Sequence, residues 1–164
     1  MNVDSLISLY NAVPTDWMII GAVAIFAAFD TLRSGARRTC TFAFALPVTY
    51  VLIGSVPQTV VLGGIAGQFS TPLLQAILFF IILAVIYVTV SRIGLSWGGE
   101  AGQTIQAALA GVAGTALLVV FWLQIPALST LYHFGADAQN IFGESYRFFW
   151  IIGSYAALAF VRNA

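Results

Sequence analysis

Long apolar runs separated by short polar connections dominate the pattern along this chain of 164 residues. A helix that crosses a bilayer needs about 20 apolar residues, and five runs approach or reach that length. We expect membrane-spanning helices at about 17–32, 39–56, 72–91, 104–124 and 146–161. The pattern therefore predicts an all-α integral membrane protein that forms a single polytopic domain over residues 1–164.

Composition supports this interpretation. Hydrophobic residues make up 60% of the chain and charged residues only 7%, whereas soluble domains carry about 25% charged residues. Because so few charged residues cannot cover the surface of a soluble protein, we expect the exterior of this protein to contact mainly the lipid bilayer. We expect no nucleic-acid partner, because a protein that binds nucleic acid requires a clustered basic face.

The segment 57–70 (PQTVVLGGIAGQFS) is apolar but too short to span a bilayer. We interpret it as a re-entrant or interface-lying segment, in which Gly63 and Gly67 would allow another helix to approach closely. A flexible loop with a few apolar residues is an equally good interpretation of the same pattern.

Two predicted spans differ in side-chain size. The span 72–91 consists almost entirely of large and β-branched residues, as expected for a helix that faces lipid. The span 104–124 begins with small residues, which form the pairs Ala107 with Gly111 and Ala110 with Gly114. Small residues four positions apart let helix backbones approach each other, so we expect this helix to be buried against its neighbours.

Positive charge is concentrated in one turn. The chain contains no lysine, and Arg33, Arg37 and Arg38 are half of its six arginines. With five spans, this turn lies on the same side of the membrane as Arg92 and Arg162, against Arg147 alone on the other side. Because cytoplasmic loops are enriched in arginine, we expect the N-terminus outside and the C-terminus in the cytoplasm.

Asp30 is the acid that lies deepest in a predicted span. It precedes Arg33 by three residues, and opposite charges at this spacing share one helix face. We therefore interpret the two as an ion pair at the membrane edge; the alternative is a proton or ion site. If any residues contact lipid headgroups or a partner, we expect them to be Asp30, Arg33, Arg37 and Arg38.

Catalytic or metal chemistry has few candidate residues. His133 and Cys40 are the single histidine and cysteine, and they fall on opposite predicted sides. A structural metal site needs about four ligands, so His133 with Asp137 is at best a fragment, and we expect no metal and no cofactor. An enzyme that uses the 126–144 loop, with His133, Asp137 and Glu144, is the least favoured alternative.

The order of these features resembles a known family. An acid (Asp16) precedes the first span, a turn with glycine and arginines follows at 33–38, and a strongly apolar third span ends in Arg92. The fourth span is rich in glycine and alanine at 110–114. Over roughly the first 125 residues this resembles the colicin V production protein family of small bacterial inner-membrane proteins. The resemblance implies an envelope-associated membrane protein and carries over no catalytic residues.

The function that we expect is that of a non-enzymatic subunit or scaffold in a larger membrane assembly. Small-residue helix faces and short loops favour it, and a chain of this size encloses little volume by itself. A homo-oligomer or other membrane subunits are therefore the expected protein partners. The main alternative is a pore or transporter component formed by oligomerisation.

Overall fold

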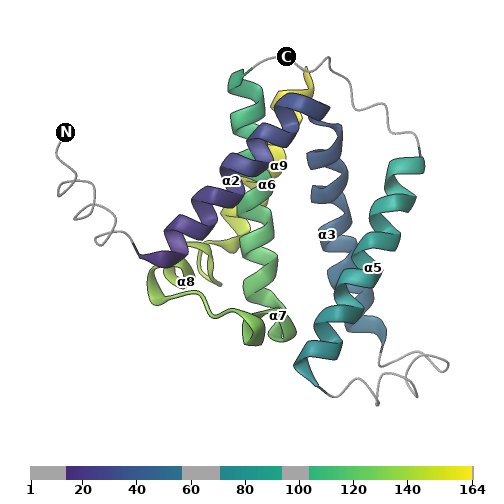
Figure 1. Ribbon diagram of the computed structural model, residues 1–164, viewed down its shortest axis with the longest axis vertical. Helices are drawn as coiled ribbons and strands as arrows, with labels where there is room; N and C mark the ends of the chain where they lie inside the picture. Colours follow the sequence, from purple (N-terminus) through teal and green to yellow (C-terminus); the bar gives the residue numbers. More distant parts are fainter. Residues whose placement is uncertain (1–13, 57–70, 94–103, 164) are drawn as a thin grey trace.

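The computed structural model describes residues 14–56, 71–93 and 104–163, and all regular elements in these ranges are helices (Figure 1). The predictions for segment 57–70 lie outside the described residues. The helices are α2 (Thr15–Ser34), α3 (Arg37–Ser55), α5 (Pro72–Arg92), α6 (Thr104–Gln124), α7 (Pro126–Leu131), α8 (Ala136–Phe142) and α9 (Arg147–Asn163).

A long helix occupies each of the five predicted spans, but only part of the span prediction is supported. Among the described residues, α2, α5 and α6 are long and apolar enough to cross a membrane. The start of α3 carries two arginines and its length includes three threonines, which lower its hydropathy. The 17 residues of α9 make it shorter than the other four long helices, about 25 Å at 1.5 Å per residue. Five spans are thus not established.

Helix α6 is the centre of the bundle. It packs against α2, α3 and α9 along its length and against α7 and α8 near its end. In the most apolar stretch of α6, 61% of the residues are buried, compared with 11% for α2 and 17% for α5. Its small first half and its bulky second half are both buried, and buried residues run from Ala107 to Phe121. The other helices therefore take their positions from α6.

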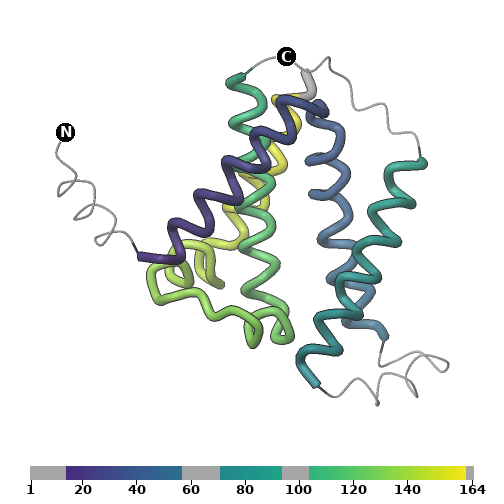
Figure 2. Tube along the Cα trace, in the orientation of Figure 1, coloured from purple at the N-terminus to yellow at the C-terminus, as the bar shows by residue number. Residues whose placement is uncertain are grey.

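The helices α3 and α5 form a second pair beside this centre (Figure 2). Buried residues of α5 such as Phe79 and Leu83 belong to the same hydrophobic core as Leu46 of α3 and Leu117 of α6. The outer face of α5 remains exposed, for example at Ile81 and Val85. This matches a helix with one face towards protein and the other towards lipid.

Pro47 lies inside α3, and the helix continues through it. Proline has no N–H group, so the carbonyl of Ala43, four residues earlier, loses its partner within the helix. The hydroxyl of Tyr155 in α9 donates a hydrogen bond of 2.7 Å to this carbonyl. A side chain from another helix thus satisfies the backbone group that proline leaves unpaired.

The connection 126–144, which the sequence suggests is the longest polar loop, contains the two short helices α7 and α8. Two indole groups hold it to the bundle. Trp122 donates from Nε1 to the carbonyl of Tyr132 at 3.2 Å, and Trp150 donates to that of Ile141 at 2.7 Å. Its buried aromatic residues, such as Phe142, form a second core with the lower part of α6.

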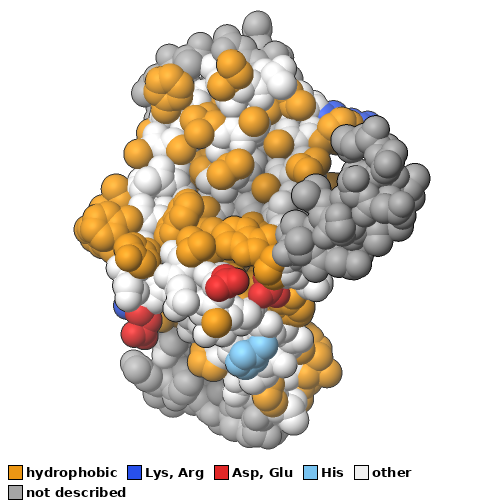
Figure 3. Space-filling model, turned by 90° about the vertical axis from the view of Figure 1, so that its left-hand side faces the viewer, with side chains coloured by type: hydrophobic (Ala, Val, Ile, Leu, Met, Phe, Trp, Pro, Cys, Tyr) orange, Lys and Arg blue, Asp and Glu red, His pale blue; other side chains and the backbone are white. Residues whose placement is uncertain are grey.

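Two hydrogen bonds show which helix ends lie together. Arg37, at the start of α3, donates to the carbonyl of Ser91 near the end of α5 at 3.0 Å. At the opposite end of the bundle, Asp16 at the start of α2 accepts a hydrogen bond from Tyr132. Acidic and histidine side chains gather at the α8 end of the face shown in Figure 3, where hydrophobic side chains cover much of the region above them.

Candidate functional site at the α2–α3 turn

The turn between α2 and α3 is tight, and its shape depends on Gly35. This glycine has φ 77° and ψ 165°, and its N–H group donates to the carbonyl of Thr31 at 2.8 Å. A positive φ is readily adopted only by glycine. The turn brings the end of α2 beside the start of α3, so residues 30–34 and 37–39 face each other.

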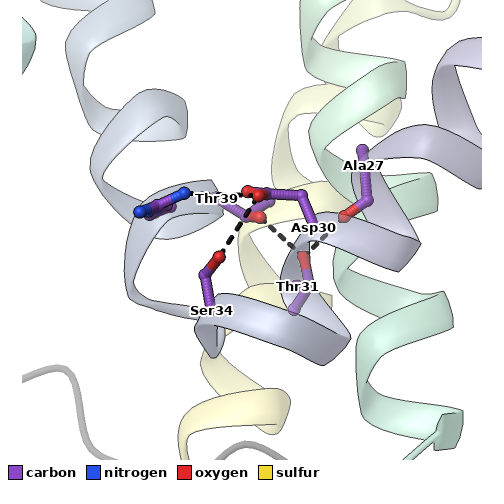
Figure 4. A network of polar contacts seen from close by, with 6 residues as sticks. Ala27, Asp30, Thr31, Ser34 and Thr39 are labelled. Atoms are coloured by element: carbon purple, nitrogen blue, oxygen red, sulfur yellow. Dashed lines mark hydrogen bonds and ion pairs between the residues drawn. The ribbon is translucent and has the colours of Figure 1, made fainter.

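Two threonine hydroxyls join the helices beside the turn (Figure 4). The Oγ1 atoms of Thr31 and Thr39 are 2.8 Å apart, and Thr31 also donates to the carbonyl of Ala27 at 2.8 Å. Both threonines are buried. Because the Thr31 hydroxyl donates to a carbonyl in its own helix, the Thr39 hydroxyl is the donor between the two residues.

Asp30 is paired with Arg38 and not with Arg33. The Oδ1 atom of Asp30 lies 3.3 Å from a guanidinium nitrogen of Arg38 and accepts a hydrogen bond of 3.2 Å from Ser34. The prediction of a pair with Arg33 followed the spacing within one helix. The turn brings Arg38 of the next helix within reach instead, so the ion pair links α2 to α3.

The three arginines of the turn are exposed, but they have different surroundings. Arg37 contacts the last turn of α5, where the unpaired carbonyl groups of a helix end attract cations. Arg38 pairs with Asp30 while its side chain remains 62% exposed. With Arg33, the four groups Asp30, Arg33, Arg37 and Arg38 carry a net charge of +2 within nine positions.

A cavity of about 460 Å³ lies beside this cluster, between α2, α3, α5 and α6. Ligand pockets in proteins usually measure about 300–1,000 Å³. The polar part of its lining consists of Asp30, Arg38, Thr39 and Thr115. The apolar part consists of Val23, Phe26, Ala27, Phe42, Leu118 and the largely apolar Tyr87.

Thr115 gives this cavity an unusual feature. Its side chain is 3% exposed, and its Oγ1 atom has no hydrogen-bond partner among the described residues. A buried hydroxyl without a partner costs about 1–3 kcal/mol of stability.

The predicted small-residue positions of α6 bring the walls of the cavity together. Ala107, Ala110, Gly111 and Gly114 are all buried. A Cβ atom at Gly111 would lie 2.5 Å from the backbone nitrogen of Ala28, and one at Gly114 would lie 2.9 Å from Cγ2 of Thr39. The two glycines thus let α2 and α3 approach α6, which sets the distance between Asp30, Thr39 and Thr115.

The opposite end of the bundle holds a polar contact that the sequence pattern did not reveal. The carboxylate of Asp16 accepts a hydrogen bond of 2.6 Å from the Tyr132 hydroxyl and one of 2.5 Å from the N–H group of Gly135. The hydrogen bond to Asp16 is the main cause that raises the pKa of Tyr132. Because 116 positions separate Asp16 from Tyr132, no local sequence pattern could indicate this contact.

The residues of the least favoured, enzymatic alternative lie apart from the cavity. His133, Asp137 and Glu144 are exposed at the α8 end. The described residues contain no group of three or more histidine, cysteine and acidic side chains that could hold a metal ion. Cys40 is buried in the hydrophobic core.

Comparison of the chain with protein-family models, curated proteins and solved structures gave no match.

Proposed function

We propose that this chain is a non-enzymatic polytopic membrane protein that acts as a subunit or scaffold of a larger membrane assembly. The observation that carries the proposal is that charged and polar side chains of this protein form contacts between its own helices. Asp16, Asp30 and Tyr155 each bind another element of the same chain. These groups hold the bundle together, as expected for a structural component.

The exterior supports the same proposal. Helix α2 exposes large side chains, with Ile25 73%, Phe26 74% and Phe29 65% exposed. An apolar surface of this kind is stable against lipid or against another membrane protein. Partners of this protein would therefore be a second copy of the chain or other membrane subunits.

The proposal includes an orientation. The α2–α3 turn and the end of α5 lie at one end of the bundle, joined through Arg37 and Ser91. If α3 and α9 also cross the membrane, the positive-inside rule places this end in the cytoplasm and the N-terminus outside. A bacterial inner membrane, as in the colicin V production protein family that the sequence resembles, is the location that we propose.

The proposal is tested by extracting the protein from its native membrane in mild detergent and identifying the proteins that co-purify at fixed stoichiometry. A defined set of membrane partners, or the chain itself in several copies, supports a subunit role. Alanine substitutions at His133, Asp137 and Glu144 provide the comparison. If they cause a loss of function in the cell while the complex stays unchanged, an enzyme is favoured.

A second candidate function is a pore or transporter component formed by oligomerisation. The observation that favours it is a second cavity, of about 570 Å³, between α3, α5 and the α6–α7 junction. Its lining includes Gln75 and Gln124, so α6 lines one cavity at its middle and the other at its last residue. Phe121, which lies between Leu118 of one lining and Gln124 of the other, is buried, and so is Leu117.

Water accessibility of single cysteines along α6 separates the two functions. In a background with Cys40→Ala, cysteines at Leu117 and Phe121 are expected to resist a water-soluble thiol reagent, because both positions are buried in the hydrophobic core. Labelling at both positions in the membrane would show a continuous wet path and would favour the transporter.

A further inference from the structure

The cavity beside the α2–α3 turn is polar at one end and apolar at the other. On α2, Asp30 lies nearer the turn than Phe26 and Val23. On α3, Arg38 and Thr39 lie nearer the turn than Phe42.

Helix α6 repeats this order. It begins at the turn end of the bundle, so Thr115 lies nearer that end than Leu118 (Figure 1). Asp30 follows Val23 by seven positions, so the gradient extends over about 10 Å along the helix. Three helices therefore place polar groups at the same end of the cavity and apolar groups deeper.

A ligand that matches this gradient is an amphiphile with an anionic head. The charged residues of the lining, Asp30 and Arg38, cancel each other. The neighbouring Arg33 and Arg37 of the turn, outside the lining, bring the net charge of the turn to +2. An arginine guanidinium has five N–H donors, and Arg38 makes a single ion pair of 3.3 Å, with Asp30. Its remaining donors are suited to a phosphate oxygen, which arginine binds through charge-assisted hydrogen bonds.

Deeper in the cavity, Thr115 is the polar residue that α6 adds to the lining. Beyond it, the side chains of Val23, Phe26 and Leu118 offer an apolar surface to a hydrocarbon chain. A phospholipid presents phosphate, ester and chain in this order from the membrane surface inward.

We propose that this cavity binds one anionic phospholipid of the leaflet at the α2–α3 turn, with its phosphate at Arg38 and one acyl chain along the cavity lining of Val23, Phe26 and Leu118. This binding does not depend on a protein partner. The lipid would fill the gap between α2 and the α3–α5 pair.

The test is native mass spectrometry of the purified full chain after exchange into dioleoylphosphatidylglycerol or dioleoylphosphatidylcholine. The two lipids share their acyl chains and differ in head-group charge. We expect one phosphatidylglycerol to be retained, with a preference of about tenfold over phosphatidylcholine. Both lipids carry the phosphate, but only phosphatidylcholine adds a choline cation, which the net positive charge of the turn would repel. Equal retention of both lipids would overturn the proposal.

Paired variants locate the site. Arg38→Gln is expected to abolish the preference, whereas Arg92→Gln, which removes an exposed arginine from the end of α5 outside the cavity, is expected to keep it. Leu118→Trp fills the cavity and should reduce retention, whereas Val112→Trp on the exposed face of α6 should not. Equal losses from both arginine variants would mean diffuse attraction by surface charge and would contradict the site.

Two further experiments test whether a variant has misfolded and whether the site binds free phosphate instead of a lipid. Asp30→Asn removes a carboxylate beside the phosphate, so retention of phosphatidylglycerol should stay equal or increase, a result that a misfolded variant cannot give. Inorganic phosphate and glycerol phosphate should not displace the lipid. If either displaces it fully, the site recognises a free phosphate and the lipid proposal is wrong.

Discussion

At the scale of single residues, side chains of this protein satisfy groups that lie far away in the sequence. Asp16 binds Tyr132 and Gly135, and Tyr155 binds the carbonyl that Pro47 leaves unpaired. Asp30 binds Arg38 across the turn. Each of these contacts joins two elements, so each is expected to affect the packing of helices more than the stability of a single helix.

The contact between Tyr132 and Asp16 predicts a dependence on alkaline pH. The raised pKa of Tyr132 means that the folded state favours the protonated phenol. The stabilisation is therefore fully present below the ordinary tyrosine pKa of about 10 and is lost as the pH rises through the raised value. Absorbance titration of tyrosinate should show a late phase whose amplitude falls by one tyrosine in Tyr132→Phe and part of which shifts to lower pH in Asp16→Asn. A late phase of unchanged amplitude in Tyr132→Phe would contradict the assignment.

The hydrogen bond from Tyr155 to Ala43 predicts an interaction with Pro47. Tyr155→Phe should lower the free energy of unfolding by about 1–3 kcal/mol, because the Ala43 carbonyl loses its donor. In a Pro47→Ala background the restored N–H group occupies that carbonyl, so the same change should cost less. A double-mutant cycle, followed by circular dichroism during denaturation in sodium dodecyl sulphate, measures the difference. Equal costs in both backgrounds would show that the carbonyl does not link the two positions.

At the scale of elements, α6 determines how closely its neighbours pack. The approach of α2 to Gly111 leaves no space for a side chain, since an added Cβ atom would meet the backbone of Ala28. The cavity and the threonine contacts lie within one or two helical turns of the point where α2 crosses α6 at Gly111. A change in the distance between α2 and α6 should therefore alter both.

Gly111→Ala is expected to lower the free energy of unfolding by about 1–3 kcal/mol, the usual cost of overpacking. Gly153→Ala is the matched control, because Gly153 lies within α9 and an added Cβ atom there meets nothing within 4 Å. This control should be neutral or stabilising by up to about 1 kcal/mol, since alanine favours helix over glycine. The same denaturation assay compares the two, and equal effects would contradict close packing at Gly111.

The positions of the long helices could be predicted from the sequence, because apolar runs and their interruptions report helix length directly. The helix over 104–124 coincides with α6, and the one over 72–91 differs from α5 by one residue. The partner of Asp30 could not be predicted, because Arg38 becomes accessible only through the turn at Gly35. The Asp16 contact and the cavity depend on how helices pack, which periodicity within one helix does not encode.

At the scale of the whole molecule, the proposed orientation predicts which side of the membrane each end faces. A C-terminal fusion to alkaline phosphatase should be inactive in a bacterial host and a fusion to green fluorescent protein should be fluorescent, because the C-terminus is proposed to be cytoplasmic. A fusion after residue 56 should give the reverse result. High phosphatase activity at the C-terminus would contradict five alternating spans.

The whole molecule also exposes more apolar surface than a soluble monomer tolerates, including the aromatic face of α2. In a membrane-embedded protein, lipid alone can cover such a surface. In the proposed assembly, other protein subunits cover part of it.

The measurement that tests this claim most directly is the native mass of the protein extracted from its own membrane in mild detergent. A single chain has a mass of 17.5 kDa. We predict a complex of defined stoichiometry with a mass at least about twice that value, after subtraction of bound lipid and detergent. A single 17.5 kDa chain, alone under every mild extraction condition, would contradict the account.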